Sequence, residues 1–215
     1  MVRAIPTPSV PTPSGMSQIG VDRFGTEYLF SRFCRLVLRR PGGSYEAFAP
    51  LCSATDMLVH PDGGVLVAEG QRVVRYMPDG SVIRVAGTGR RGHSADGGPA
   101  DQAPLRYPTD LAWAADGGLL IADRNDDRVR RVDPLDGTIS TLAGSGEHGF
   151  GGDGGPATAA PLDWPARLVV GRHGGFAIVE QGYPRPRVRR VGGGGTIHTV
   201  AGGGPRATSV AVPRC

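Results

Sequence analysis

The chain has 215 residues, of which 35 are glycine and 19 are proline, and its formal net charge is +4. That much glycine and proline would interrupt any long helix, so a helix-rich protein is excluded. The sequence has no apolar run near the roughly 20 residues that a membrane-spanning helix needs, and so weak a positive charge does not indicate a nucleic-acid-binding protein.

The chain opens with the proline-rich segment MVRAIPTPSVPTPSG, which lacks the apolar core of a secretory signal. We expect residues 1–16 to form a disordered lead. A cytoplasmic location follows if this is the true start, and an extracellular one if the true N-terminus lies upstream. The three cysteines (Cys34, Cys52 and Cys215) lack zinc-site spacing, and whether Cys34 and Cys52 are bonded stays open.

An internal repeat organises the rest of the chain. The phrases DGSVIRVAGTG, DGTISTLAGSG and GGTIHTVAGGG end at Gly89, Gly146 and Gly204, which are 57 and 58 residues apart. Each follows an arginine-rich apolar phrase (RVVRY, RVRRV, RVRRV), and before that a run ending in an acid (VLVAE, LLIAD, FAIVE). Another short apolar run opens each unit. A degraded copy lies upstream and lacks the long glycine-rich insert that separates the later units.

Each unit therefore holds four short runs rich in valine, isoleucine and leucine, separated by Gly, Asp or Pro turns. Four short antiparallel strands per repeat are typical of a propeller blade. The sequence predicts an all-β fold over 17–215, a partial or open propeller of about four four-stranded blades. The blades are expected at 17–49, 54–87, 109–144 and 166–202. A leftover strand with the pattern of an innermost strand is expected at 207–212.

The order of an apolar strand, a DGG turn, LLIAD, NDDRVRRVD, DGTISTLAGSG and GGDGGPA resembles the NHL repeat of bacterial-type β-propellers. The resemblance extends from Ile19 to Val212. It implies a propeller, commonly of six blades, whereas this chain holds four units and one strand. We therefore expect an open arc, whose free blade edges pair with a protein partner or with a second copy.

A binding site is expected on one rim of the blades. The long connections 87–108 and 144–165 should emerge beside the short turns that follow each second strand. Long loops in a compact domain commonly carry function, which favours a non-enzymatic interaction or ligand-binding scaffold with no catalytic residues. The predicted rim contacts are Arg91, His93, Arg124, Asp127, His148 and Tyr183.

Five carboxylates are predicted to be structural anchors of turns. Asp96 and Asp153, in the two DGGPA loops, should bond the backbone of their own Gly-Gly turn. Glu69, Asp123 and Glu180 end equivalent strands and should bond backbone N–H groups and nearby arginines. One carboxylate per loop is too few for calcium, so we predict no metal site and no cofactor.

Two alternatives to the scaffold stay open. If Glu69, Asp123 and Glu180 faced one pore they could bind a cation, as acids do in propellers of the gluconolactonase and strictosidine-synthase type. That resemblance would imply a lyase or a lactone hydrolase with a metal in its central channel. The second alternative is RNA binding through the arginine-rich third strands, whose arginines are expected on the wetter face of each strand.

Two G-x-G-x-x-G matches, at 87–92 and 144–149, carry no dinucleotide site in our interpretation. A pyrophosphate site needs such a loop between a strand and the N-terminus of a helix. Neither match is followed by helical periodicity, and the two recur in register. We interpret both as connections between blades.

Overall fold

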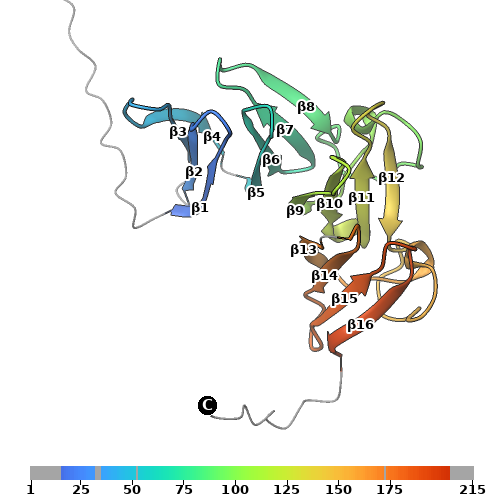
Figure 1. The fold of residues 1–215 in the computed structure, drawn as a ribbon. Coiled ribbons are helices and arrows are strands. Elements are labelled where there is room, and N and C mark those ends of the chain that lie inside the picture. Colours follow the sequence, from blue (N-terminus) through green and yellow to red (C-terminus); the bar gives the residue numbers. More distant parts are fainter. Residues whose placement is uncertain (1–15, 32–34, 52, 172, 204–215) are drawn as a thin grey trace, which may run out of the picture.

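The computed structural model describes residues 16–31, 35–51, 53–171 and 173–203, and within them it shows sixteen strands in four four-stranded sheets (Figure 1). The all-β prediction is therefore confirmed, and we call the four sheets blades 1 to 4. The expected disordered lead and the strand expected at 207–212 lie outside the described residues. No helix among the described residues is long and apolar enough to cross a membrane.

Within each blade, every strand pairs antiparallel with its neighbour in chain order. Blade 1 contains β1 (Met16–Val21), β2 (Glu27–Ser31), β3 (Arg35–Arg39) and β4 (Glu46–Pro50). Blade 2 contains β5 (Ala54–Val59), β6 (Val65–Glu69), β7 (Arg72–Tyr76) and β8 (Val82–Ala86). Blade 3 contains β9 (Pro108–Trp113), β10 (Leu119–Asp123), β11 (Arg128–Val132) and β12 (Ile139–Ala143). Blade 4 contains β13 (Pro165–Val170), β14 (Phe176–Glu180), β15 (Arg187–Val191) and β16 (Ile197–Gly202).

The blades follow one another along an arc, with blades 1 and 4 at its two ends (Figure 1). The first strands β5, β9 and β13 are in contact along its inner side. Three single-turn 3-10 helices lie in the connections: η1 (Ala100–Gln102), η2 (Arg124–Asp126) and η3 (Ala157–Ala159).

Apolar side chains from facing sheets form one core at each junction between blades. Between blades 2 and 3, Leu66 and Val73 pack against Leu111 and Ile121, with Leu105 of the connecting segment closing the cluster. The junctions of blades 1 with 2 and of blades 3 with 4 hold equivalent clusters. A blade therefore has two apolar faces, and removing a neighbour would expose one of them to water.

The face that blade 4 turns away from blade 3 has no such cover among the described residues. Leu66 and Val73 of blade 2 are buried, whereas their repeat equivalents in blade 4, Ala177 and Val188, are only half-buried. Val169 on the same blade is exposed. This uncovered apolar face agrees with the open arc expected from the sequence.

The two long connections, which we call insert 1 (residues 87–107) and insert 2 (residues 144–164), lie along the outer strand of the blade that follows each. The Gly97 N–H donates to the Ile139 carbonyl (2.8 Å), and the Ile139 N–H donates to the Gly98 carbonyl (2.9 Å). Insert 2 repeats this arrangement with Gly154 and Ile197 (2.8 Å). Each Gly-Gly pair thus hydrogen-bonds to the outer strand and extends the sheet of that blade by a short segment.

We expected the aspartates of the DGGPA loops to bond the backbone of their own turns. In the structure they instead join the inserts to the blades. Asp96 Oδ2 accepts the Thr141 N–H (2.9 Å), and Asp96 Oδ1 accepts a hydrogen bond from Arg130 Nη2 (2.9 Å). Asp153 does the same with the Thr199 N–H (3.0 Å) and Arg189 Nη2 (2.6 Å). Both carboxylates still serve as structural anchors, but of a contact between insert and blade.

Arg130 and Arg189 are fully buried, which corrects the expectation that third-strand arginines face water. The inserts cover them and supply carbonyl acceptors, such as Gly151 O at 2.7 Å from Arg189 Nη2. Blade 2, which no insert precedes, carries Val74 at this strand position, and blade 1 carries Val37. The RNA alternative loses these two arginines, because a buried guanidinium that is paired with a carboxylate cannot contact phosphate.

We expect Arg130→Ala and Arg189→Ala each to lower the free energy of unfolding by about 2–4 kcal/mol, because each removes a buried guanidinium with its charge-assisted hydrogen bonds and leaves a cavity. Arg190→Ala, at an exposed position beside Arg189, is the control and should change it by less than about 0.5 kcal/mol. Denaturant unfolding curves measure all three variants. Equal effects at Arg189 and Arg190 would contradict the assignment.

Candidate binding site on the long-loop rim

The β10–β11 turn and the ends of both inserts meet on one rim of blades 3 and 4. The turn contains η2 and ends at Asp127, whose φ of 48° lies in the left-handed region. Its backbone is fixed to the end of insert 1, because the Asn125 N–H donates to the Arg106 carbonyl (3.0 Å). The turn therefore presents two consecutive aspartates, Asp126 and Asp127, to the two inserts.

Asp126 lies on the side of the turn that faces insert 1 and contacts side chains of that insert. Its carboxylate is buried, and Oδ2 lies 2.7 Å from Arg128 Nη1 and 3.1 Å from His93 Nδ1. Arg106 Nη1 approaches Oδ1 at 3.8 Å. Three nitrogen-bearing side chains thus converge on one carboxylate, which ties the predicted rim residue His93 to the blade.

Asp127 makes the matching contact with insert 2. Oδ1 accepts the Trp164 N–H (2.9 Å), and Oδ2 lies 3.1 Å from His148 Nδ1. The other ring nitrogen of His148 lies 3.3 Å from Asp163 Oδ1. Burial raises the pKa of the Asp127 carboxyl, and the bonds from Trp164 and His148 oppose that rise. The imidazole is therefore held between two carboxylates.

Trp164 forms an aromatic platform at this corner. The Arg124 guanidinium carbon lies 4.7 Å from the centre of the indole, and the His148 ring lies 5.4 Å from it. Trp164 is 37% exposed, so part of the ring surface is open to solvent. A guanidinium beside an exposed aromatic ring can bind a flat or apolar group that carries a negative charge.

The structure brings four of the six predicted rim residues to one corner: Arg124, Asp127, His148 and, through Asp126, His93. The other two are more peripheral. Arg91 is an exposed residue of insert 1, and Tyr183 is 91% exposed in the β14–β15 connection. Both lie on loops of the predicted rim, but among the described residues neither forms a hydrogen bond, ion pair or ring contact with this corner.

Sequence reasoning missed Trp164 and Asp126, although a signal for Trp164 was present. An aromatic residue precedes the proline that begins the inner strand in two units, as Tyr107-Pro108 and Trp164-Pro165. Both aromatic residues adopt positive φ angles, 81° and 55°. Recurrence of this pair in register marks a constrained position on the rim.

Of the three acids that end the second strands, Glu69 bonds an arginine of its own blade, Asp123 bonds the end of insert 1, and Glu180 forms ion pairs with arginines but no side-chain hydrogen bond with any described residue. Glu69 Oε1 accepts a hydrogen bond from Arg72 Nη2 (2.6 Å), and Asp123 Oδ1 accepts the Arg106 N–H (2.8 Å). Glu180 is fully buried with Arg187 Nη1 at 3.7 Å. Burial raises the pKa of Asp123 and of Glu180 to about 7 in each case.

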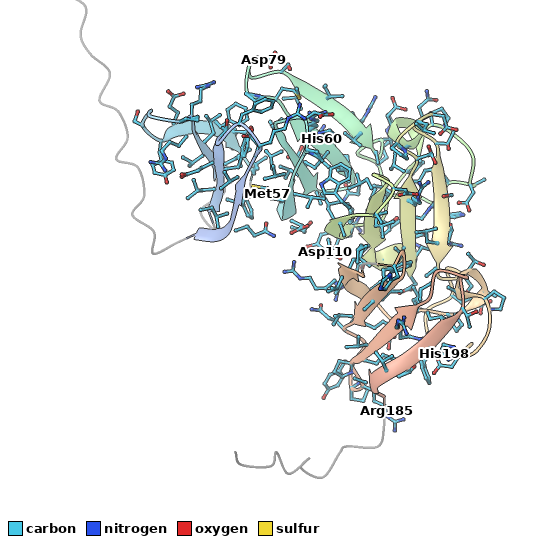
Figure 2. The ribbon with its side chains drawn as sticks, in the orientation of Figure 1. Met57, His60, Asp79, Asp110, Arg185 and His198 are labelled. Atoms are coloured by element: carbon cyan, nitrogen blue, oxygen red, sulfur yellow. The ribbon has the colours of Figure 1, made fainter. Side chains whose placement is uncertain are left out.

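A second polar row, also missed, lies along the inner side of the arc. It is formed by the third residue of each first strand: Gln18, Asp56, Asp110 and Arg167. Asp56 Oδ2 accepts the Leu111 N–H (2.8 Å), and Asp110 Oδ2 accepts the Leu168 N–H (2.7 Å). Figure 2 shows Asp110 on this inner side, where blades 3 and 4 meet. The phrases DMLV, DLAW and RLVV carried the signal, since they begin at this position.

The two carboxylates of this inner row, Asp56 and Asp110, which we call the axial carboxylates, fit a metal ion poorly. Arg167 Nη1 lies 2.8 Å from Asp110 Oδ1 and 3.8 Å from Asp56 Oδ1, so a guanidinium occupies the space between the two acids. Burial raises the pKa of Asp56 to about 6, and the nearby Asp110 adds to that rise. Among the described residues, no group of three or more His, Cys, Asp or Glu side chains could hold a metal ion.

No protein-family model matches the chain. The Arabidopsis thaliana protein SUPPRESSOR OF QUENCHING 1, chloroplastic, is 29% identical over 76 residues, which are 35% of this chain and 7% of that protein. A match of this extent does not establish a family.

Solved β-propeller structures resemble the fold. A Bacteroides thetaiotaomicron protein of unknown function matches with a TM-score of 0.63 and 18% identity, over 82% of this chain and 47% of its own. Virginiamycin B lyase from Staphylococcus aureus matches with a TM-score of 0.57 and 15% identity, over 86% of this chain and 55% of its own. An auxiliary nutrient binding protein from Bacteroides thetaiotaomicron matches with a TM-score of 0.56 and 16% identity, over 73% of this chain and 43% of its own. This chain spans about half the length of these structures, and identities so low establish the fold alone.

The buried Asp123 carboxyl gives the fold a pH dependence of definite sign. Its pKa rises from 3.8 to about 7 on folding, so the folded state binds the extra proton and stability falls as pH rises through this window. Asp123→Asn keeps an acceptor for the Arg106 N–H and cannot ionise. The melting temperature of the variant minus that of the wild type should therefore increase between about pH 5 and about pH 8. Asp136→Asn, in an exposed turn, is the control, and a flat difference for Asp123→Asn would contradict the assignment.

Proposed function

We propose that the chain is part of an NHL-type β-propeller that acts as a non-enzymatic scaffold and binds a protein or ligand through its long-loop rim. The observation that carries the proposal is the corner at which Arg124, Trp164 and His148 lie together. The buried Asp127 bonds the His148 ring and the Trp164 backbone N–H, the Arg124 guanidinium lies against the Trp164 ring, and insert 2, which carries His148 and Trp164, is fixed to blade 4. A surface so preorganised loses little conformational entropy when it binds.

The composition of this corner also supports binding. Exposed tryptophan, tyrosine and arginine side chains supply most of the energy in protein interfaces, and the rim offers Trp164, Tyr183 and Arg124. The similar fold of a nutrient binding protein is consistent with a binding role. The proposed contact residues are those expected from the sequence, Arg91, His93, Arg124, Asp127, His148 and Tyr183, together with Trp164.

A propeller lyase or lactone hydrolase with a metal in the central channel is the second candidate. Two observations favour it: Asp56 and Asp110 belong to neighbouring inner strands and are close enough to repel each other, and the chain shares its fold with virginiamycin B lyase. Against it, both carboxylates accept backbone N–H groups from the next blade, and Arg167 lies between them. These contacts support a structural role for the axial row.

Site-specific photo-crosslinking tests the rim. A benzophenone amino acid placed at Tyr183 or at His148 should yield a defined crosslinked partner in the source cells. Leu135, which is 95% exposed in the β11–β12 turn at the opposite end of the blade, is the matched control and should not yield it. The same partner captured equally at Leu135 would contradict a rim-specific site.

Metal content separates the scaffold from the enzyme. After gentle purification without chelator, the protein should contain far less than one equivalent of any divalent metal. Added magnesium, calcium or zinc should leave the melting temperature unchanged, because binding that is specific to the folded state would raise it. An equimolar metal that disappears in Asp56→Asn and Asp110→Asn would instead establish the metal-dependent alternative.

A further inference from the structure

The outer strand of blade 2 lacks the cover that the outer strands of blades 3 and 4 possess. Inserts 1 and 2 lie along β12 and β16, but only residues 51–53 connect blade 1 to blade 2, so no insert pairs with the outer edge of β8. The helix η1 of insert 1 contacts only the end of this strand, where Ala86 packs against Ala100. The first residues of β12 and β16, Ile139 and Ile197, are 0% exposed, whereas Val82 of β8 is 54% exposed. The first residue of the outer strand is therefore covered in blades 3 and 4 and open to solvent in blade 2.

The pairing of insert 1 with β12 defines how the open edge could be filled. Pro99 forms an antiparallel bridge with Thr138, Gly98 bonds Ile139, and Asp96 bonds Thr141. The repeat aligns Val82, Ile83 and Arg84 with residues 139–141. An added segment in the same register would set two residues against Val82 and Ile83, and the carboxylate that precedes them against Arg84.

Arg84 has the charge that this register requires. In blades 3 and 4 a threonine stands at this position, and its backbone N–H donates to the aspartate of the insert. In blade 2 the side chain is a guanidinium, and it forms no ion pair or hydrogen bond within the part of the chain that the structure describes. A charge-assisted hydrogen bond to an incoming carboxylate would satisfy it.

The backbone of the occupant is also defined. Gly97 and Gly154, which directly follow the aspartates in the inserts, have φ angles of 90° and 82°. Residues other than glycine rarely adopt such backbone angles. A segment that repeats this geometry on β8 needs glycine directly after its acid.

The edge adjoins a pocket of about 730 Å³ between blades 2 and 3. Ile83 and Val85 of β8 line one side of it, and Trp113 and Leu119 of blade 3 line another. Ile83 is 49% exposed. The pocket therefore gives residues that flank the acid an apolar surface to contact, as side-chain pockets do where peptides add to sheet edges.

We propose that the β8 edge is a docking site for an extended segment of a partner protein in which an acidic residue is followed by two glycines. The segment would add a short strand to blade 2, as Asp96–Gly98 does on blade 3, with its carboxylate on Arg84. This surface is separate from the rim of inserts 1 and 2, so it stands whether or not the rim binds a partner.

Peptide binding to the purified full chain tests the proposal. The probe is a fluorescent peptide, SADGGPADQ, with the sequence of residues 94–102. Its anisotropy should saturate with a dissociation constant between about 10 µM and about 1 mM, as expected for a short strand with one charged contact. The peptide with asparagine in place of the first aspartate should bind about tenfold more weakly, the fold-change for one charge-assisted hydrogen bond.

Two variants locate the bound peptide. Arg84→Ala should weaken binding about tenfold, whereas Arg90→Ala, an exposed arginine of insert 1, should not change it. Val82→Pro removes the edge N–H and should abolish binding while the melting temperature is retained, since proline is tolerated at the first residue of an edge strand.

Three results would overturn the proposal. The first is no saturable binding at several times the upper dissociation constant. The second is equal binding to Val82→Pro and to the wild type, which would mean that the peptide displaces a native insert. The third is concentration-dependent dimerisation that Val82→Pro abolishes, which would make the occupant a second copy of this chain.

Discussion

The arrangement of this protein depends on two buried arginines, Arg130 and Arg189, and on their pairing with the half-exposed carboxylates of Asp96 and Asp153. Each pair joins a blade to a glycine-rich insert that has little apolar surface with which to attach itself. A buried guanidinium is costly without a partner, so a blade that carries the arginine also requires the insert. The insert then seals the outer strand and places His93 or His148 at the rim.

A second set of contacts joins the blades to one another. Apolar cores make each blade stack on the next, and the axial carboxylates Asp56 and Asp110 bind the backbone of the following inner strand. These hydrogen bonds give the stack direction, since nonpolar packing alone would allow one sheet to slide along another. At blade 4 the position is taken by Arg167, which is a donor and points back to Asp110. This row of inner-strand residues therefore changes from acids to a base at blade 4, the blade whose outward apolar face no described residue covers.

The presence and the absence of one insert account for the two surfaces that we propose. Where the insert is present, it orders the rim beside Trp164 and buries the outer strand. Where it is absent, as before blade 2, the strand edge and Arg84 remain available. A single difference in connection length, three residues against about twenty, thus separates a structural edge from a candidate binding edge.

The sequence alone determined the architecture, because strand periodicity, Gly and Asp turns and the repeat near 57 residues are local properties of the chain. It also pointed to His93, Arg124, Asp127 and His148, since loop length and register indicate a shared rim. It did not predict that Asp96 pairs with Arg130, which is 34 residues further along the chain, or that this arginine is buried. Nor did it predict that Trp164 joins the rim. Those outcomes depend on which segments the packed blades bring together, and an arginine beside valine in a strand has the same local pattern whether an insert or water covers it.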